Sequence, residues 1–441
     1  MAGETVVAPG SPLAIKHFST SLHVENERRS VFLTQMSEPV STDRMAASKM
    51  EKQQTSAHMP IVIVTDLVSQ AGDTLSIDME KIVSGAPFMG DDEMEGRGEN
   101  MTFDSFDMKI DQTRFPIKAG GRMTRKRTAH NLRTLARSQM VNWFAKFNDQ
   151  VIQVHLAGAR GDQDTGDWNV PLENDRRFRR TMINPVLPPT SNRYFVAGGG
   201  ANVTEIGTTD FLKLEDIAVI TAHLRDSPFP PAPIRILTAS GGEMIEMWCL
   251  MVTERQWHYI VEFAGGPESQ QWRQIVADSV KRAMLTKHPI FTGECGMWNG
   301  TLIKKQTRAI RFNPGSMVKI TNSQTGIETA HEVPALGGAA SGAAVDRALL
   351  VGGQALALAR GDSSSPGVAA YPVRWTEVLR DHSNNLEIGG GQVDGKMKMR
   401  FESTEDELTD FGVCAIDSFA PAINSTAGAA LRSSDPFRGT M

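Results

Sequence analysis

Apolar residues recur at three- and four-residue steps between positions 122 and 158, and this is the clearest pattern in the chain. The spacing is that of one face of an α-helix, and the residues are Leu132, Ala136, Met140, Trp143, Phe144, Phe147, Val151 and Val154. Thr124 is a suitable N-cap and Gly158 a suitable end. We therefore predict a helix over residues 124–157, about 50 Å long at 1.5 Å per residue. His155 lies on its apolar face and is interpreted as a core histidine rather than a ligand.

Alternating polar and apolar residues predict two strands on either side of a polar segment. The strands are expected at 74–83 and 101–110, and the segment 84–100 between them is rich in glycine. It carries an acidic run formed by Asp91, Asp92, Glu93 and Glu95. This order predicts a long β-hairpin whose polar tip projects from the molecule. The acidic run fits a solvated loop or a partner site, and it lacks the ligand spacing of a calcium loop.

The remaining pattern mixes short strands and helices and predicts an α+β fold. Strands are expected at 60–64, 234–237, 257–263, 300–305, 309–312, 318–321, 373–378, 396–401 and 411–420. Helices are expected at 212–224, 270–283 and 343–360, the last with a face of small residues. No internal repeat is present.

Residues 1–60 show no sustained period, although apolar residues are scattered through them, among them Leu22, Phe32, Leu33 and Met36. Isolated apolar residues need burial, which favours an arm that docks on a partner over a flexible tail. An arm and a projecting hairpin would expose apolar side chains and strand edges in a monomer. The pattern therefore indicates a subunit that is completed by its neighbours in a symmetric assembly.

Two groups of arginines are candidate binding residues. The first turns of the long predicted helix carry Arg125, Arg127, Arg133 and Arg137, where cations oppose the helix dipole. They therefore need compensation from the chain's own carboxylates, a neighbouring subunit or phosphates. The irregular segment 160–207 contains Arg176, Arg177, Arg179 and Arg180 around a phenylalanine. This loop fits either a phosphate clamp or a surface loop paired with acidic residues.

Composition narrows the function classes. The 441 residues are 22% charged with a net charge of −5, which excludes a wholly disordered chain and argues against a bulk nucleic-acid binder. Cys249, Cys295 and Cys414 form no CxxC pair, so neither a disulfide framework nor a cysteine zinc site is expected. The sequence has no signal peptide and no apolar run long enough to cross a bilayer, so we expect a soluble protein made in a reducing cytoplasm.

Catalytic and nucleotide-binding motifs do not emerge from the sequence. The glycine-rich stretches at 337–342 and 389–395 lack the spacing of a P-loop or a dinucleotide fingerprint. No nucleophile elbow or metalloprotease motif is found. We therefore expect no catalytic residue, no metal and no cofactor.

Three segments resemble a known family. They are Gly293-Glu-Cys-Gly-Met-Trp-Asn-Gly-Thr-Leu-Ile, Asp346-Arg-Ala-Leu-Leu-Val-Gly-Gly-Gln-Ala-Leu-Ala-Leu-Ala and Asp410-Phe-Gly-Val-Cys-Ala-Ile-Asp-Ser. Together with the order of elements from about residue 61 to 421, they resemble the major capsid proteins of tailed bacteriophages. The resemblance is narrower to the short-tailed, schitovirus-type phages, and the fold is shared with the herpesvirus capsid floor and encapsulins.

The resemblance implies a division of the chain. Residues 1–60 become the N-terminal arm and 72–115 the extended loop (E-loop) that lies over an adjacent subunit. The peripheral domain takes 61–71 and 116–239, with a spine helix at 124–157 and an insert at 160–207 that has no clear place in the minimal fold. Residues 240–370 become the axial domain, 371–422 return to the peripheral domain, and 423–441 form a tail.

The resemblance also implies a structural role. The expected function is a non-enzymatic subunit that forms hexamers and pentamers of an icosahedral head enclosing double-stranded DNA. Expected partners are other copies, the portal, scaffold or cement proteins, and packaged DNA through non-specific contact, with no membrane. The expected location is the virion, assembled in the host cytoplasm. The alternative is a phosphate- or nucleotide-dependent enzyme that uses the 176–180 loop and a glycine-rich loop.

Overall fold

The computed structural model describes most of the chain, in separate ranges. They are 22, 25–37, 58–65, 72–80, 89, 95, 98, 103–128, 131–163, 167–237, 244–306, 308–336, 342–361, 373–382, 384–403 and 407–422. Within them, no helix is both long enough and apolar enough to span a bilayer.

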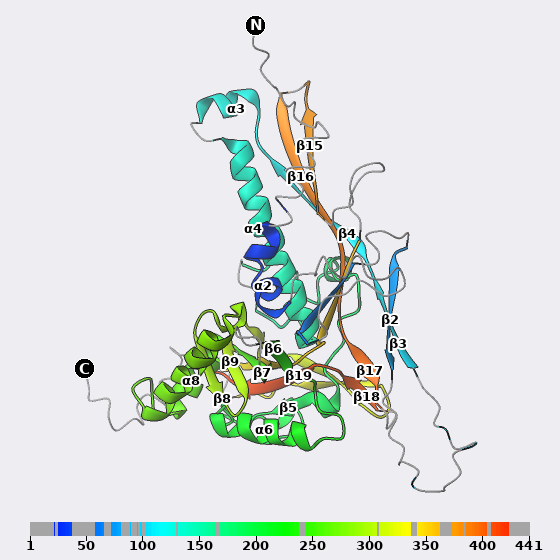
Figure 1. The fold of residues 1–441 in the computed structure, drawn as a ribbon. Coiled ribbons are helices and arrows are strands. Elements are labelled where there is room, and N and C mark those ends of the chain that lie inside the picture. Colours follow the sequence, from blue (N-terminus) through cyan, green and yellow to red (C-terminus); the bar gives the residue numbers. More distant parts are fainter. Residues whose placement is uncertain are drawn as a thin grey trace.

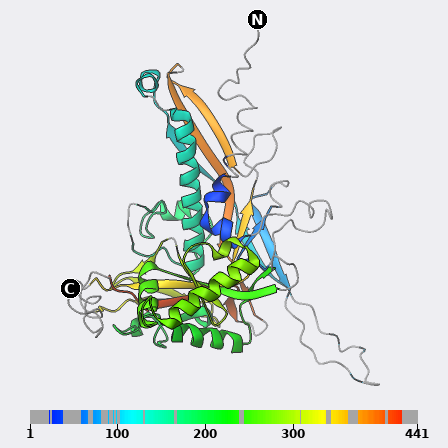
Figure 2. The same cartoon turned by 60° about the vertical axis from the view of Figure 1, so that its left-hand side comes forward.

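The described chain has the shape of an upright joined to a base (Figure 1). The upright combines helix α4 (Leu132–Ala157) with strands β4 (Asp111–Lys118), β15 (Val373–Arg380) and β16 (Asn385–Lys398). The base is built on a larger sheet, with helices α6 (Leu214–Asp226), α7 (Glu254–Phe263) and α8 (Gln270–Thr286). Turned by 60°, the molecule shows α4 running beside the orange β15–β16 pair down into the base (Figure 2).

The long predicted helix is interrupted near its start. Helix α3 covers Arg122–Arg127, Thr128 is extended, and α4 begins at Leu132. The prediction of one helix over 124–157 with Thr124 as its cap is therefore wrong. The side chain of Asn131 accepts hydrogen bonds from the N–H groups of Arg133 and Thr134, which starts a second helix. The predicted end at Gly158 is confirmed, because this residue has φ 66°.

Strand β16 is the centre of a five-stranded sheet. Its first half lies between β4 and β15, and its last residues pair with β14 (Leu356–Arg360), which pairs in parallel with β1 (Ile61–Val64). Helix α4 packs closely on β16 at Gly390. A Cβ atom there would lie 2.3 Å from the Met140 sulfur and 2.7 Å from the Phe144 ring. The glycine-rich stretch at 389–395 is thus part of a strand, and Gly390 allows the close helix–sheet contact.

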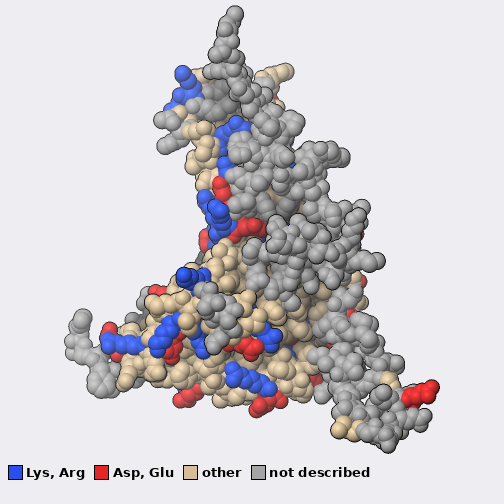
Figure 3. All heavy atoms as spheres, viewed as in Figure 1, with Lys and Arg blue, Asp and Glu red and all other residues tan. Residues whose placement is uncertain are grey.

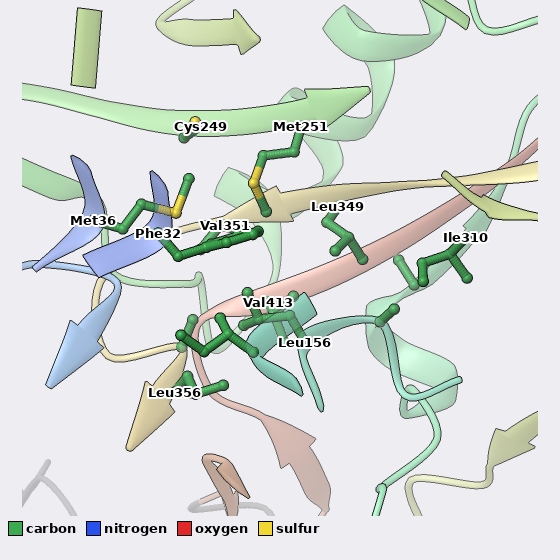
Figure 4. Packing of buried hydrophobic residues seen from close by; sticks show 14 of the residues in the cluster. Phe32, Met36, Leu156, Cys249, Met251, Ile310, Leu349, Val351, Leu356 and Val413 are labelled. Carbon is green, nitrogen blue, oxygen red and sulfur yellow. The ribbon is translucent and has the colours of Figure 1, made fainter. Parts of the chain in front are cut away.

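The base contains an eight-stranded sheet in the order β5-β19-β13-β7-β9-β8, with β10 beside β13 and β6 beside β7. Its strands are β5 (Tyr194–Val196), β6 (Ile234–Leu237), β7 (Met244–Val252), β8 (Cys295–Trp298), β9 (Thr301–Lys305), β10 (Ile310–Phe312), β13 (Val345–Val351) and β19 (Val413–Phe419). One face packs against α6, α7 and α8, and the other meets the end of α4. Figure 4 shows this second face, where Leu156 of α4 lies near Val413 of β19.

Two elements of the base differ from the sequence prediction. The helix expected over 343–360 is instead the strand pair β13 and β14, joined by a turn in which Gln354 has φ 55°. All seven residues of β13 are buried because both faces of its sheet are covered, so its pattern does not alternate. The strand expected over 257–263 is α7, which is started by a capping box formed by Thr253 and Gln256.

Other predicted elements are confirmed within two or three residues. Helices α6 and α8 match 212–224 and 270–283, and most predicted strands match β1, β6, β9, β10, β11, β15 and β19. The strand expected at 396–401 falls on the end of β16 and on β17. Smaller hairpins are β2 (Thr74–Glu80) with β3 (Phe103–Lys109), β11 (Met317–Thr321) with β12 (Glu328–Glu332), and β17 (Arg400–Glu402) with β18 (Leu408–Asp410). Short helices are α2 (Val31–Met36), α5 (Phe178–Thr181), η3 (Ser191–Arg193), η4 (Val203–Glu205) and η5 (Pro289–Phe291).

The described part of residues 1–60 packs on its own chain. In α2, Phe32, Leu33 and Met36 are 2–8% exposed and join the core that contains Ile152 of α4. For these apolar residues the expectation of burial on a partner is wrong, because the same chain covers them. The flanking residues 1–21 and 38–57 lie outside the described ranges.

Candidate functional site

The described strands of the β2–β3 hairpin pack against the body, with Phe106 on Phe401 and Asp104 accepting from the Glu402 N–H at 2.8 Å. The strands pair from Thr74 with Lys109 to Glu80 with Phe103. Leu75, Phe106 and Met108 of the hairpin are buried. The Asn184 side chain accepts from the Lys109 N–H and donates to the Lys109 carbonyl, both at 2.9 Å. Figures 1 and 2 show the blue strands leading outward from the upright. A hairpin of two strands gains little stability alone, so this geometry suits a contact with another molecule.

The predicted acidic tip is only partly described. Glu95 is exposed, whereas Asp91, Asp92 and Glu93 lie outside the described residues. The role of these four carboxylates therefore stays a prediction.

The basic face of the upright is compensated in part by the chain itself. Arg133 donates to Glu377 of β15 at 2.6 Å, and Arg137 pairs with Glu25 at 2.5 Å. Arg125 and Arg127 lie instead on α3, and Arg127 is exposed with no ion pair to another described residue. The charges of Arg133 and Arg137 are thus balanced by carboxylates of the same chain. In Figure 3 lysines and arginines follow the upright toward its free end.

The 176–180 loop presents charge but no aromatic platform. Arg176, Arg177, Arg179 and Arg180 are all exposed, and only Arg177 forms an ion pair within the described chain, with Asp175 at 2.8 Å. That contact lowers the pKa of Asp175. Phe178 is half-buried and packs on the cluster around α4. The loop therefore offers an open cationic surface and not a stacking clamp.

The insert at 160–207 packs along the side of α4. Buried Arg160 stacks over Trp168 at 3.6 Å from the ring centroid and donates to the Val170 carbonyl at 3.0 Å. Gln150 of α4 accepts from the N–H groups of Asn169 and Val170 at 2.7 and 3.1 Å. These bonds occupy polar groups that burial would otherwise leave unpaired. The insert thus supports the upright where it enters the base.

Buried ion pairs join the strands of the base, and the sequence patterns do not predict them. Arg347 and Asp417 are directly opposite on β13 and β19, and both are 0% exposed. Asp410 binds Lys398 at 2.6 Å and Arg400 at 2.8 Å. Burial lowers the pKa of Lys398 to about 8, with Asp410 opposing the shift. A charged residue inside an apolar run, such as Asp417 within 411–420, is the available signal, but nothing local points to its distant partner.

Potential catalytic groups are sequestered. Cys249 and Cys414 are 0% exposed, and burial raises the pKa of both thiols to about 12. His155 is 1% exposed, as the sequence predicts for a core histidine, and burial lowers its pKa to about 3. Among the described residues no three His, Cys, Asp or Glu side chains gather at metal-binding distance. Of the glycine-rich stretches, 389–395 lies in and near β16, and 337–341 falls outside the described residues.

Comparisons with known proteins agree on one family. A family model described as phage capsid protein matches residues 6–422. The major capsid protein of Pseudomonas phage KPP25 is 30% identical over 141 residues, which are 32% of this chain and 37% of that protein. The match therefore spans little more than a third of the curated relative.

Solved structures extend the likeness to the fold. The capsid of Ralstonia phage GP4 superposes with a TM-score of 0.66 at 24% identity, covering 88% of this chain and 100% of that chain. The cyanophage Pam1 capsid asymmetric unit gives a TM-score of 0.54 at 14% identity, covering 87% and 94%. At these identities the superpositions show that the chain has the fold of phage capsid subunits.

Proposed function

The chain belongs to the phage capsid protein family, and we propose that it is the major subunit of an icosahedral head, assembling into hexamers and pentamers around double-stranded DNA. The family match over residues 6–422 carries this proposal. The relatives are structural proteins of the virion and not enzymes. The outward hairpin supports the assembly role, because its strands pair only with each other within the described residues.

The proposed division of the subunit follows the elements. Residues 61–71, 116–239 and 371–422, with α4 and β16, belong to the peripheral domain, and residues 240–370 form the axial domain. The eight-stranded sheet of the base takes strands from both ranges. The hairpin between residues 72 and 115 is the E-loop, which lies over the adjacent subunit. Two features support this assignment: the upright is long and narrow (Figure 1), and the hairpin lies at its side, where its strands pair only with each other within the described residues.

Charged surfaces supply the proposed contacts. The acidic tip residues Asp91, Asp92, Glu93 and Glu95 meet cations of a neighbouring copy. The exposed Arg176, Arg179 and Arg180 meet an anionic partner, either phosphates of the packaged DNA or carboxylates of a neighbour. A net charge of −5 fits a shell that contacts DNA locally and does not coat it with positive charge. Portal and scaffold or cement proteins complete the proposed partners, and assembly takes place in the host cytoplasm.

The enzyme alternative has no support in the geometry. Phe178 packs on the α4 cluster, and Gly390 makes room for Met140 and Phe144. Phe178 and Gly390 therefore serve packing within the subunit, whereas the four arginines of the loop form an exposed surface.

Electron microscopy and light scattering of the purified chain test the assembly role. We expect capsomers or closed particles, with or without scaffold, and a monomer at micromolar concentration would contradict it. Deleting residues 84–100 should abolish assembly while the thermal unfolding of the subunit stays unchanged. A second variant that keeps the loop length and neutralises Asp91, Asp92, Glu93 and Glu95 isolates the charge. Normal particles from the deletion variant would exclude the E-loop assignment.

A further inference from the structure

An apolar groove opens between α7, α8 and β8 on the base. Its volume is about 670 Å³, and its floor contains Trp257, Trp272 and Phe291. One wall is a stripe along α8 formed by Val276, Val280 and Met284, of which Val280 is 45% and Met284 72% exposed. Because the floor and the rim both carry large apolar side chains, covering this surface is energetically favourable.

The described chain ends against α7, one of the helices that border this groove. Near the C-terminus, the Tyr259 hydroxyl donates to the Pro421 carbonyl at 3.2 Å, and Arg255 donates to the Ala420 carbonyl at 3.1 Å. Both donors are on α7, the helix that also supplies Trp257 to the groove. Residues 423–441 follow Ala422 and lie outside the described residues. This C-terminal segment therefore starts on the far side of one helix from the groove.

The length and chemistry of the segment fit the groove. A helix with its side chains is about 10–12 Å across, whereas the stretch from Ala422 to Leu431 can span about 30 Å. Between residues 424 and 440, Leu431 and Phe437 are the large apolar residues of a stretch otherwise rich in small and polar ones. Arg432 and Arg438 follow each of them by one position, and Glu294 provides an exposed carboxylate at the rim.

We propose that segment 429–438 of the same chain binds in this groove, with Leu431 and Phe437 against the α8 stripe and the tryptophan floor. The reach of the stretch from Ala422 favours the chain's own tail over the tail of a second copy, because about 30 Å of chain is enough to pass around one helix. The segment then covers apolar surface that the subunit would otherwise expose to water. This inference is independent of the assembly role, since it concerns contacts within one subunit.

The three native thiols allow a direct test. Cys295 lines the groove, whereas Cys249 and Cys414 are fully buried in the sheet and serve as internal controls. In unassembled subunits ending at Ala422, we expect an alkylating reagent to modify Cys295 at least tenfold faster than in the full chain. The rates at Cys249 and Cys414 should not change. Equal Cys295 rates in the two proteins would overturn the proposal.

Point variants in the full chain test the docking without truncation. Leu431→Asp with Phe437→Asp should raise the Cys295 rate as much as the truncation does. Ser425→Asp with Ser434→Asp adds the same charge to the same segment and should leave the wild-type rate. A wild-type rate in the Leu431 and Phe437 double variant would refute the docking.

Crosslinking identifies which copy provides the tail. In a Leu431→Cys variant, a short bismaleimide should join residue 431 to Cys295 within one chain, giving a product of single-chain mass whose digest contains a peptide linking the two positions; absence of that peptide would overturn the docking. A product of twice that mass would overturn the same-chain assignment and favour a second copy as the occupant.

Discussion

The carboxylate of Asp149 in α4 accepts a hydrogen bond of 2.5 Å from the hydroxyl of Ser30, the N-cap residue of α2. It also accepts from the N–H groups of Val31 and Phe32 at 3.1 and 3.2 Å. Burial raises the pKa of Asp149, and these hydrogen bonds oppose the shift. One buried side chain of the upright thus satisfies the first backbone donors of α2 and ties residues 25–37 to the body.

Replacing Asp149 with asparagine should loosen the N-terminal segment. The amide carries no charge and cannot accept all three hydrogen bonds, so we expect a loss of about 1–3 kcal/mol in the free energy of unfolding. Limited proteolysis should cut faster within residues 25–37. The matched control is Asp278→Asn on α8, where the carboxylate pairs with Lys281 at the surface and its loss costs under about 1 kcal/mol. Equal effects of the two substitutions would contradict the role of Asp149.

Much of the fold is predictable from local pattern, and the failures have physical causes. Helix α8 and strand β1 are predicted correctly because their periods and flanking residues agree. Strand β13 resembles a helix in sequence because it is buried on both faces, so its apolar residues also fit a helical stripe. The break before α4 depends on one asparagine cap, Asn131, within a run whose pattern is otherwise helical.

The candidate surfaces are less predictable than the elements. The sequence predicts the hairpin and both arginine groups, but it does not show that Glu377 and Glu25 pair with Arg133 and Arg137. Those partners are separated by 244 and 112 residues in the chain. Likewise, the contacts of Asp149 appear only once α2 is placed on α4. Pairings over such distances depend on the tertiary structure and leave no local periodicity.

His155 should make the subunit sensitive to acid. Its pKa is lowered to about 3 by burial and by nearby Lys396 and Lys398, whereas an unfolded histidine titrates near 6.5. Between these values the unfolded chain binds a proton that the native chain does not. Stability therefore falls as the pH drops below about 6.5, by at most about 1.4 kcal/mol per pH unit.

Denaturant unfolding at pH 7 and pH 5 measures this effect. Replacing His155 with glutamine removes the titration, so the variant should lose about 2 kcal/mol less than the wild type over that interval. The comparison is of slopes, because the substitution itself changes stability at pH 7. Identical slopes for His155→Gln and wild type would rule out His155 as the source.

The Arg347–Asp417 pair should be essential to the base. Two contacts of 2.7 Å join the side chains, Tyr194 donates to Asp417 at 2.8 Å, and Arg347 donates to the Ala157 carbonyl at the end of α4 at 2.8 Å. Arg347→Met leaves a buried carboxylate without its cation, which costs about 3–5 kcal/mol. Equilibrium unfolding in urea measures the loss.

Two companion variants separate charge from packing at this pair. Adding Asp417→Asn to Arg347→Met removes the uncompensated charge while the amide oxygen still accepts from Tyr194, so the double variant should be more stable than the single one. Arg235→Met removes an exposed cross-strand partner of Glu246 in the same sheet and should cost under about 1 kcal/mol. A double variant less stable than Arg347→Met would show that charge burial is not the main cost.

Gly390 should be a position where the upright tolerates little added volume. An alanine Cβ would approach the Met140 sulfur to 2.3 Å and the Phe144 ring to 2.7 Å, so α4 or its side chains must move, at a cost of about 1–3 kcal/mol. At Gly391, the next residue of the same strand, the nearest atom to a Cβ is the Arg114 Cγ at 3.5 Å. Gly391→Ala should therefore be close to neutral, and thermal unfolding of the two variants gives the comparison.

Combining Gly390→Ala with Met140→Ala should cost less than the sum of the single changes, because the added methyl group enters the space that the methionine leaves. Additive losses of stability, or equal losses at Gly390 and Gly391, would show that the packing of α4 on β16 does not depend on this contact.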